Sequence, residues 1–358
     1  MPLPHAARYR HRMALAVAPT TGTTIAPAGA GGTRAVLEAA ITASAAETPA
    51  ALALVIETEG STYVTRGALA LYAFDTTGTN VRRTGWLSGG CLEPEIEVHA
   101  RDAIARRALV WLELDTRDDD ALFGGAALGC RGRLRIALLP LAAMSGFASL
   151  AGRWLVGESE LAWSLDARGT LACTLDDVVE RWSIDTMPPP WLAPDRAGAR
   201  WSHTHASPPA VLVLGTGPEA PLLLPLLRAL GCVVVAAESR PRWRANAMLA
   251  DEVLVLAPRE AIGTATRERR YDAALVMHHS FELDRDALEA LAATTIPYVG
   301  LLGPTRRRDD LASLLPETAR ASLAPRLRSP IGMKLGGEGP EAIALSIAAQ
   351  LQAALHAA

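Results

Sequence analysis

Lysine is almost absent from this 358-residue chain, which holds 35 basic residues but only one lysine, Lys334. An enzyme that uses pyridoxal phosphate needs a Schiff-base lysine, and Lys334 lies in a glycine-rich segment without that setting. Direct cysteine desulfurase chemistry is therefore excluded. The motif G-x-x-x-x-G-K-[ST] is also missing, which excludes ATP hydrolysis of the P-loop type.

Cysteine is scarce as well: the four cysteines, Cys91, Cys130, Cys173 and Cys232, lie far apart. Without a CxxC pair, a zinc ribbon and a thioredoxin-type motif are excluded. So few cysteines in a chain of this length do not form a disulfide framework. We therefore expect reduced thiols and a cytoplasmic protein.

Long apolar runs are missing too. No run approaches the roughly 20 residues that span a membrane, and residues 1–32 lack the apolar segment of a signal peptide. Their bias toward alanine, threonine, glycine and proline predicts a disordered lead. The net charge is -3 and the pI about 6.3, so we expect no basic surface for nucleic acid.

The pattern of the remaining chain predicts two domains. Residues 33–185 combine helical spacing with apolar strand patterns and are predicted to form a mixed α/β domain. The proline-rich residues 186–209 favour extended chain and are predicted to be a linker. In residues 210–358, strands alternate with helices, which predicts a Rossmann-like, doubly wound parallel sheet.

A glycine-rich turn opens this second domain. The sequence GTGPEA at residues 215–220 fits G-x-G-x-x-A, follows a predicted strand and begins a helix. Gly215 and Gly217 would let a pyrophosphate approach the helix N-terminus, and Glu238 ends the next strand, where an acid holds a ribose hydroxyl. The alternative is a fold that keeps this turn for packing after losing its ligand.

Two histidines, His278 and His279, end a further predicted strand. An NAD(P)-dependent oxidoreductase, the main alternative function, would use a histidine here as acid or base. Neighbouring strand residues point to opposite faces, so we expect only His279 to face the site. A surface pair without a role is the simpler interpretation.

Two cysteines lie in glycine-rich turns. Gly89 and Gly90 precede Cys91 at the start of a predicted helix, whose dipole favours a thiolate, whereas Glu93 opposes it. Cys130 lies in the sequence LGCRG. No histidine is close in sequence, so a papain-like dyad is not indicated, and a small buried hydrophobe remains the alternative interpretation.

Six blocks, in this order, resemble the xanthine dehydrogenase accessory proteins, the XdhC/CoxI family. They are GSTYVTRGALAL (60–71), SGGCLEPEI (88–96), LGCRGRLRIALLPL (128–141), LGTGPEAPLLLPLLRALGCVVVAAESRPRW (214–243), YVGLLGPTRRR (298–308) and PIGMKLGGEGPEAIALSIAAQLQA (330–353). The likeness covers about residues 35–140 and 210–355.

The resemblance implies a cofactor-insertion chaperone rather than a catalyst. Such a factor binds the molybdenum cofactor (molybdopterin, including its cytosine dinucleotide form) and protects it. It supports sulfuration, with a cysteine desulfurase as sulfur donor, and delivers the cofactor to an apo molybdenum hydroxylase of the xanthine dehydrogenase or CO dehydrogenase type. It also implies self-association. The residues expected to contact the cofactor are Gly89, Gly90, Cys91, Glu93, Cys130, Gly215, Gly217, Glu238, Arg240 and His279. Cys91 and Cys130 are the thiols expected to contact molybdenum or a transferred sulfur.

Several positions depart from the family pattern. Arg328 stands where histidine is frequent, Lys334 where aspartate is usual, and Ser280 follows His279 in place of a polar residue or histidine. If these positions touch a nucleotide, this chain binds it differently or not at all. An interaction protein without catalysis and a sulfurtransferase that uses Cys91 remain further alternatives.

Overall fold

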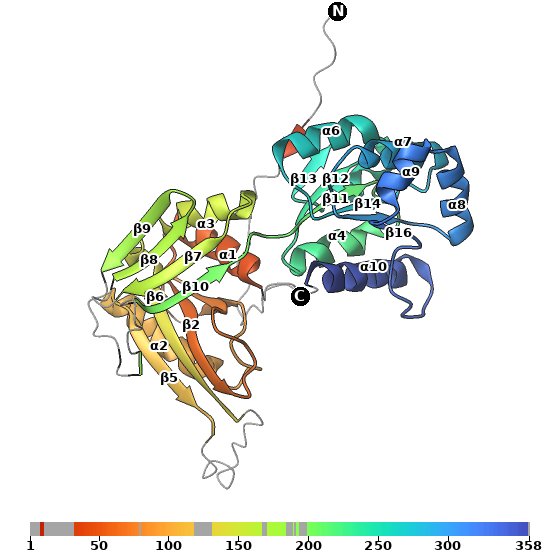
Figure 1. Ribbon diagram of the computed structural model, residues 1–358. Helices are drawn as coiled ribbons and strands as arrows, with labels where there is room; N and C mark the ends of the chain where they lie inside the picture. The colour runs from red at the N-terminus through yellow and green to blue at the C-terminus, as the bar shows by residue number, and fades with distance from the viewer. Residues whose placement is uncertain are drawn as a thin grey trace, which may run out of the picture. The chain divides into compact units, whose positions relative to one another are not determined.

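The computed structural model describes residues 8–10, 32–78, 80–117, 131–166, 170–183, 189, 191–192 and 199–356. The chain forms two compact units (Figure 1). The N-terminal unit is Ala18–Ser207, and the C-terminal unit is Met1–Val17 with Pro208–Ala358. Each unit has its own sheets and hydrophobic core, as expected of separate domains.

The N-terminal unit is built on a five-stranded antiparallel sheet with the order β4-β3-β2-β6-β5. Its strands are β2 (Ala50–Gly60), β3 (Leu69–Phe74), β4 (Val81–Thr84), β5 (Val110–Asp115) and β6 (Gly132–Pro140). The central strand β2 is apolar without alternation because both faces of the sheet are covered. Leu52 and Leu54 face one core cluster, and Ala53 and Val55 face the other.

Different elements cover the two faces of this sheet. Helix α2 (Glu93–Arg106) packs on one face. On the other face lie α1 (Thr33–Ala45), η2 (Leu141–Ala143), α3 (Phe147–Val156) and a second sheet. The predicted mixed α/β domain is therefore an arrangement of two antiparallel sheets with three α-helices among the described residues.

The second sheet has four antiparallel strands in the order β10-β7-β8-β9. They are β7 (Leu161–Asp166), β8 (Thr170–Leu175), β9 (Val178–Ser183) and β10 (Ala199–His205). Strand β10 lies inside residues 186–209, so this part of the predicted linker is wrong. Trp201 explains the difference: its indole is buried, and Nε1 donates a hydrogen bond to the Ile56 carbonyl at 2.8 Å.

The C-terminal unit contains six parallel strands in the order β13-β12-β11-β14-β15-β16. They are β11 (Ala210–Leu214), β12 (Val233–Ala237), β13 (Glu252–Leu254), β14 (Ala273–Val276), β15 (Tyr298–Leu301) and β16 (Leu327–Arg328). In chain order this is 3-2-1-4-5-6, the Rossmann arrangement, in which the switch point falls between β11 and β14. The predicted Rossmann-like sheet is confirmed.

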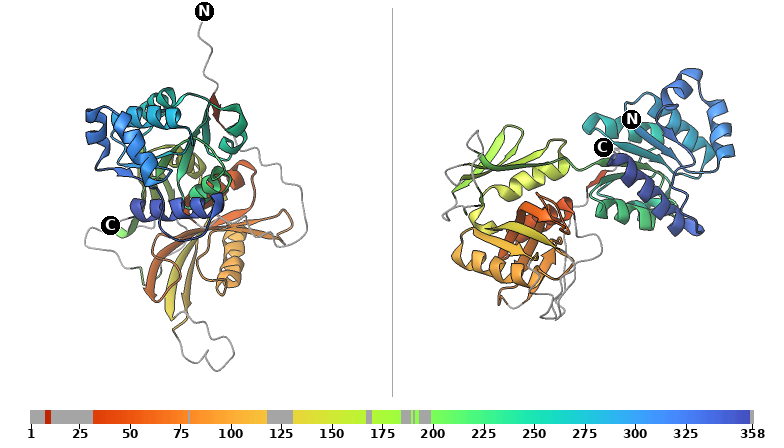
Figure 2. Two further views of the ribbon diagram at one scale, coloured as in Figure 1. Left: turned by 90° about the vertical axis from the view of Figure 1, so that its right-hand side faces the viewer. Right: turned by 60° about the horizontal axis from the view of Figure 1, so that its bottom comes forward.

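Helices cover both faces of the parallel sheet (Figure 2). One face carries α4 (Ala220–Ala229), α5 (Arg244–Ala247) and α10 (Gly339–Leu355). The other carries α6 (Pro258–Glu268), α7 (Phe281–Ala292), α8 (Thr305–Leu314) and α9 (Glu317–Leu323). The short helix η3 (Pro241–Trp243) precedes α5. Adjacent β11 residues pack in opposite layers, as alternation along a strand requires.

Part of the N-terminal lead belongs to the C-terminal unit. Strand β1 (Arg8–Arg10) pairs antiparallel with β13 at the edge of the parallel sheet. The prediction of a disordered lead over residues 1–32 is therefore wrong for these three residues. Residues 1–7 and 11–31 lie outside the described residues.

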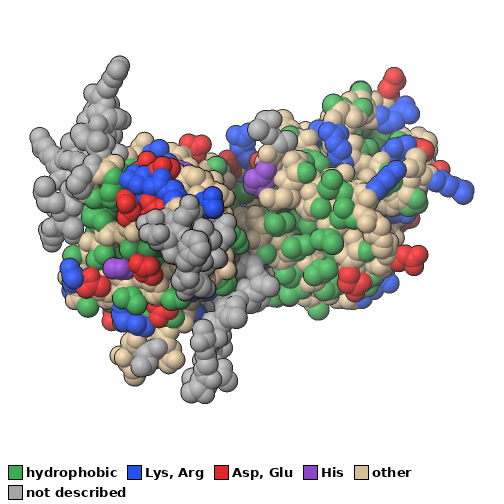
Figure 3. Space-filling model, turned by 90° about the horizontal axis from the view of Figure 1, so that it is seen from below, with side chains coloured by type: hydrophobic (Ala, Val, Ile, Leu, Met, Phe, Trp, Pro, Cys, Tyr) green, Lys and Arg blue, Asp and Glu red, His purple; other side chains and the backbone are tan. Residues whose placement is uncertain are grey.

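Helices α4 and α10 leave apolar side chains on the surface. Figure 3 shows hydrophobic side chains gathered on this face of the C-terminal unit. Leu222 and Leu345 are the large exposed side chains of the two helices. Within the described ranges, no helix has the length and apolar character needed to cross a membrane.

Trp201 tests the assignment of β10 to the N-terminal unit. Trp201→Ala is expected to lower the free energy of unfolding by about 3 kcal/mol, because it leaves a cavity in a packed core. Chemical denaturation followed by circular dichroism measures this change. Tyr63→Ala, at a side chain 62% exposed, is the control and should change stability little. An equally small change for Trp201→Ala would show that the proline-rich segment is a free linker after all.

Candidate functional site

Three loops leave the five-stranded sheet at the same end of its strands, which forms one rim of the sheet. The strand register pairs Gly60 with Gly132, Asp115 with Arg133, and Thr84 with Leu71. The segments 61–68, 85–92 and 116–131 therefore begin or end at this edge. Described parts of the first three sequence blocks, around Gly60, Ser88 and Gly132, therefore lie at one end of the sheet. We call this place the N-terminal edge.

The turn before α2 is closed by a serine and a buried carboxylate. Glu93 is 1% exposed and accepts hydrogen bonds from the Ser88 amide, at 2.8 Å, and from the Ser88 hydroxyl. The Ser88 hydroxyl oxygen in turn accepts a hydrogen bond from the Leu92 amide at 3.0 Å. Glu93, predicted to contact the cofactor, is placed here with both oxygens engaged inside the turn.

The residues between these anchors are open to solvent. Gly89, Gly90 and Cys91 are exposed, and Cys91 is a free thiol. Gly90 has a φ of 109°, which only glycine adopts without strain. A Cβ atom at Gly89 or Gly90 would meet no atom within 4 Å. The turn therefore presents a thiol at a helix start with free space on its glycine side.

The loop 61–68 is held by the strand that was predicted to be a linker. His205 Nε2 lies 2.9 Å from the Gly67 carbonyl, and Arg66 donates a hydrogen bond to the Ser202 carbonyl. The rings of His203 and His205 lie 4.7 Å apart. Burial lowers the pKa of His205 to about 4. His205 therefore holds a loop of the N-terminal edge in its neutral form.

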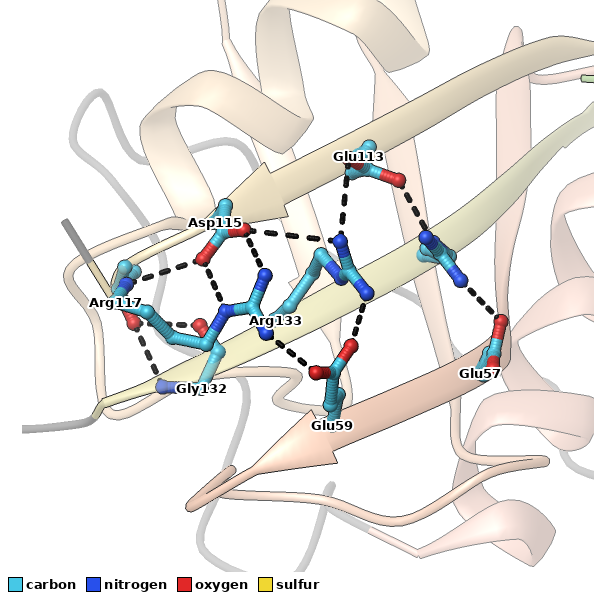
Figure 4. A network of polar contacts seen from close by, with 9 residues as sticks. Glu57, Glu59, Glu113, Asp115, Arg117, Gly132 and Arg133 are labelled. Carbon is cyan, nitrogen blue, oxygen red and sulfur yellow. Dashed lines mark hydrogen bonds and ion pairs between the residues drawn. The ribbon is translucent and has the colours of Figure 1, made fainter. Parts of the chain in front are cut away.

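A ladder of charged side chains supports the third loop (Figure 4). Arg133 and Arg135 of β6 lie between acidic side chains of β2 and β5, namely Glu57, Glu59, Glu113 and Asp115. Thr116 bonds to the Gly132 carbonyl through its amide and hydroxyl, at 2.9 and 2.7 Å. The hydrogen bond from Arg117 holds the pKa of Asp115 down at about 2. The ladder fixes both ends of a segment that contains Cys130, which itself lies outside the described residues.

The glycine-rich turn of the C-terminal unit follows β11 at the switch point of the parallel sheet. Gly215 has a φ of 93°, and a Cβ atom there would lie 2.6 Å from the His278 Cα atom. Only glycine fits this approach, which brings the turn against the end of β14. The predicted residues Gly215, Gly217 and His279 are thus brought together.

Glu238 is fully buried beside this turn. Its carboxylate accepts hydrogen bonds from the Thr216 amide at 2.9 Å and from Arg240 Nε and Nη2, both at 2.8 Å. Arg240 Nη1 donates to the His278 carbonyl at 2.6 Å. Burial raises the pKa of Glu238, but the hydrogen bonds outweigh it and hold the pKa below its usual range. Glu238 and Arg240, both predicted to contact a ligand, are engaged with each other.

His279 lies over the glycine-rich turn. Its Nε2 is 3.0 Å from Glu219 Oε2, and its ring lies 3.0 Å from the Cβ position of Gly217. The Glu219 carboxylate is 4% exposed, whereas the His279 side chain is 48% exposed. The hydrogen bond that His279 donates to the Glu219 carboxylate raises the pKa of His279 above its usual value.

His278 points elsewhere and is buried with a second carboxylate. Its Nδ1 lies 3.0 Å from Asp284 Oδ1, and Arg307 Nη2 lies 2.6 Å from Asp284 Oδ2. Sequence reasoning missed Glu219 and Asp284, and it interpreted Arg306–Arg308 as a solvated face, whereas Arg307 pairs with Asp284. A charged residue inside the G-x-G-x-x-A motif was the available signal for Glu219. Searched over the residues that the structure describes, the chain shows no group of three or more histidine, cysteine, aspartate or glutamate side chains able to hold a metal ion.

Comparison with known families covers both units. Residues 211–351 match the family model described as the XdhC Rossmann domain, and residues 43–113 match the model of the XdhC and CoxI family. The chain belongs to the XdhC and CoxI family. The first match spans the glycine-rich turn and both histidines, and the second spans Cys91.

Two relatives align with most of this XdhC and CoxI family chain. One, from Bacillus subtilis, is named as a probable xanthine dehydrogenase subunit and is 25% identical over 317 residues, which cover 84% of this chain and 92% of the relative. The other is a crystal structure of a xanthine dehydrogenase from Bacillus halodurans, with a TM-score of 0.70 and 26% identity. It covers 90% of this chain and 96% of its own.

The pair of His279 and Glu219 gives a first prediction for this site. Glu219→Gln is expected to lower the pKa of His279 toward 6.5, because the carboxylate that favours the imidazolium is gone. An NMR titration of the imidazole carbon-bound protons measures the change. Glu282→Gln, at an exposed carboxylate of α7, is the control. An unchanged pKa in Glu219→Gln would mean that the two side chains do not pair in solution.

His205 gives a prediction about acid stability. Its pKa falls from 6.5 in the unfolded chain to about 4 in the fold. Below pH 6.5 the unfolded chain binds a proton that the folded chain does not, so stability decreases as the pH falls from 6.5 to 4. The loss from this residue is at most about 3 kcal/mol.

Denaturation at several pH values between 7 and 4 measures the effect of His205. His205→Gln removes the titrating group and keeps a hydrogen-bond donor for the Gly67 carbonyl. Its stability should fall less steeply with acid than that of the wild-type chain. Equal slopes in the two proteins would show that His205 titrates normally.

Proposed function

We propose that this XdhC and CoxI family protein is a maturation factor for a molybdenum hydroxylase. It binds the molybdenum cofactor as cargo, protects it, supports its sulfuration and delivers it to an apo-enzyme of the xanthine dehydrogenase or CO dehydrogenase type. Membership in the family supports this role, and so do two relatives whose names refer to xanthine dehydrogenase.

The structural observation that supports the proposal is the exposed thiol of Cys91. A soft thiolate ligand suits molybdenum or a transferred sulfur. The Ser88 and Glu93 anchors fix the turn, so Cys91 is presented by a rigid support rather than by a loose loop. The open space at Gly89 and Gly90 leaves room for a bulky cofactor.

The partners follow from the same chemistry. The sulfur donor is a cysteine desulfurase, because the single lysine, Lys334, does not support that reaction within this chain. We place the protein in the cytoplasm, where its thiols stay reduced. The apolar face of α4 and α10 supplies a surface for self-association. An NAD(P)-dependent oxidoreductase gains no support, since Glu238 is engaged with Arg240.

Cys91→Ser tests the proposal. The variant is expected to fold like the wild-type chain, because Cys91 is exposed, yet to bind the molybdenum cofactor at least about tenfold more weakly. Anaerobic titration with the isolated cofactor measures binding. A second assay adds an apo-hydroxylase with a cysteine desulfurase and measures the hydroxylase activity recovered.

Two glycine variants sharpen this test. Gly89→Ala adds a methyl group where no atom lies within 4 Å, so it should leave the fold intact and weaken cofactor binding by obstruction. Gly152→Ala adds the same group in open space on α3 and is the matched control. Full maturation by both Cys91→Ser and Gly89→Ala would remove the N-terminal edge from the proposed function.

A further inference from the structure

A dinucleotide turn must offer hydrogen-bond donors to the pyrophosphate. In such turns the free N–H groups at the helix N-terminus and the positive end of the helix dipole bind the phosphate oxygens. The turn of residues 215–220 keeps the glycines of this motif. Its donors therefore decide whether a phosphate can be held.

Most of these donors are already used or missing. The Thr216 amide donates to Glu238, and the Ala220 amide donates to the Gly217 carbonyl at 3.1 Å. Pro218 and Pro221 have no N–H group. The turn is thus short of donors before any ligand arrives.

The Glu219 carboxylate lies at the place in the turn where a phosphate group would bind. Its carboxylate is paired with His279, whose Nε2 lies 3.0 Å from Glu219 Oε2. Glu219 is the N-cap of α4, and its negative charge lies near the positive end of the helix dipole, although it makes no side-chain cap hydrogen bond. Among the described residues of this turn, the amides of Gly217 and Glu219 donate no hydrogen bond to another residue, and the His279 ring lies directly above Gly217.

The negative charge of Glu219 also opposes phosphate binding at this turn. Where a phosphate site presents donors and a positive potential, this turn presents a carboxylate that is 4% exposed. A phosphate that entered would lie beside a like charge in a poorly solvated place, where repulsion is strong. The second recognition element of a dinucleotide site is occupied too, since Glu238 accepts hydrogen bonds from Arg240 and Thr216.

We infer that Glu219 is a specificity-determining residue that keeps the phosphate groups of dinucleotides out of the glycine-rich turn. His279 holds the carboxylate in place and lies over Gly217. This role of Glu219 belongs to the C-terminal unit alone. It does not depend on Cys91 or on a client enzyme, so its failure and that of the maturation role are read in different assays.

Calorimetric titration of the full chain with NADH, NADPH and sodium pyrophosphate tests the inference. The wild-type chain is expected to bind all three weakly. Glu219→Gln keeps the size of the side chain and removes its charge, and should bind them at least about tenfold more tightly. His279→Ala removes the counter-cation and leaves the carboxylate, so it should show no such gain.

Glu282→Gln is the matched control, since it removes an exposed carboxylate from the first turn of α7. It should bind like the wild-type chain. Circular dichroism checks that each variant is folded, and Glu219→Ser replaces Glu219→Gln if that variant unfolds. Tight NADH binding by the wild-type chain, or no gain in a folded charge-free variant at residue 219, would overturn the inference. A gain of equal size in His279→Ala would also overturn it, because a steric lid would then be sufficient.

Discussion

The buried carboxylate of Glu238 is the interaction on which the C-terminal site depends. An ionised carboxylate without partners inside a protein is very costly, so a fully buried one must be compensated locally. Arg240 does this with two hydrogen bonds, and a third joins the same guanidinium to the His278 carbonyl. The Thr216 amide adds another. One charge pair thereby fixes the ends of β11, β12 and β14 relative to one another.

The same principle organises the N-terminal edge on a smaller scale. Glu93 is buried at the start of α2 and is compensated by the amide and hydroxyl of Ser88. The amides of Gly90 and Leu92 donate to the same Ser88 hydroxyl oxygen, so the turn is held without a contact from the Cys91 side chain. Cys91 can therefore be exposed without the turn being loose. Glu93, which the sequence predicted to contact the cofactor, supports the turn that carries the thiol.

Sequence reasoning recovered what depends on local pattern. Alternating strands and helices predicted the parallel sheet. His279 lies over the glycine-rich turn, but strand alternation is not the reason, because β14 ends at Val276 and His279 has a φ of 54°. The failures concern long-range pairing. Strand β10 is stabilised by Trp201 and by its register with β7, and composition alone could not show this for a proline-rich segment. The partner of Glu219 lies 60 residues away, and Arg307 lies 23 residues from Asp284, so the sequence near either carboxylate does not show these pairs.

The two candidate places differ in what they leave for a ligand. At the N-terminal edge, hydrogen bonding is complete within the anchors, and the glycines and the thiol between them face open space. At the switch point of the C-terminal unit, most of the groups that a dinucleotide would need are already paired within the chain or are prolines. Fold and motif alone would have directed attention to the second place, because its glycine pattern is the better known. The hydrogen bonds at the two places favour the N-terminal edge over the glycine-rich turn as a ligand site. The glycine-rich turn is explained largely by its own internal contacts, whereas the exposed Cys91 has no structural role that requires a thiol.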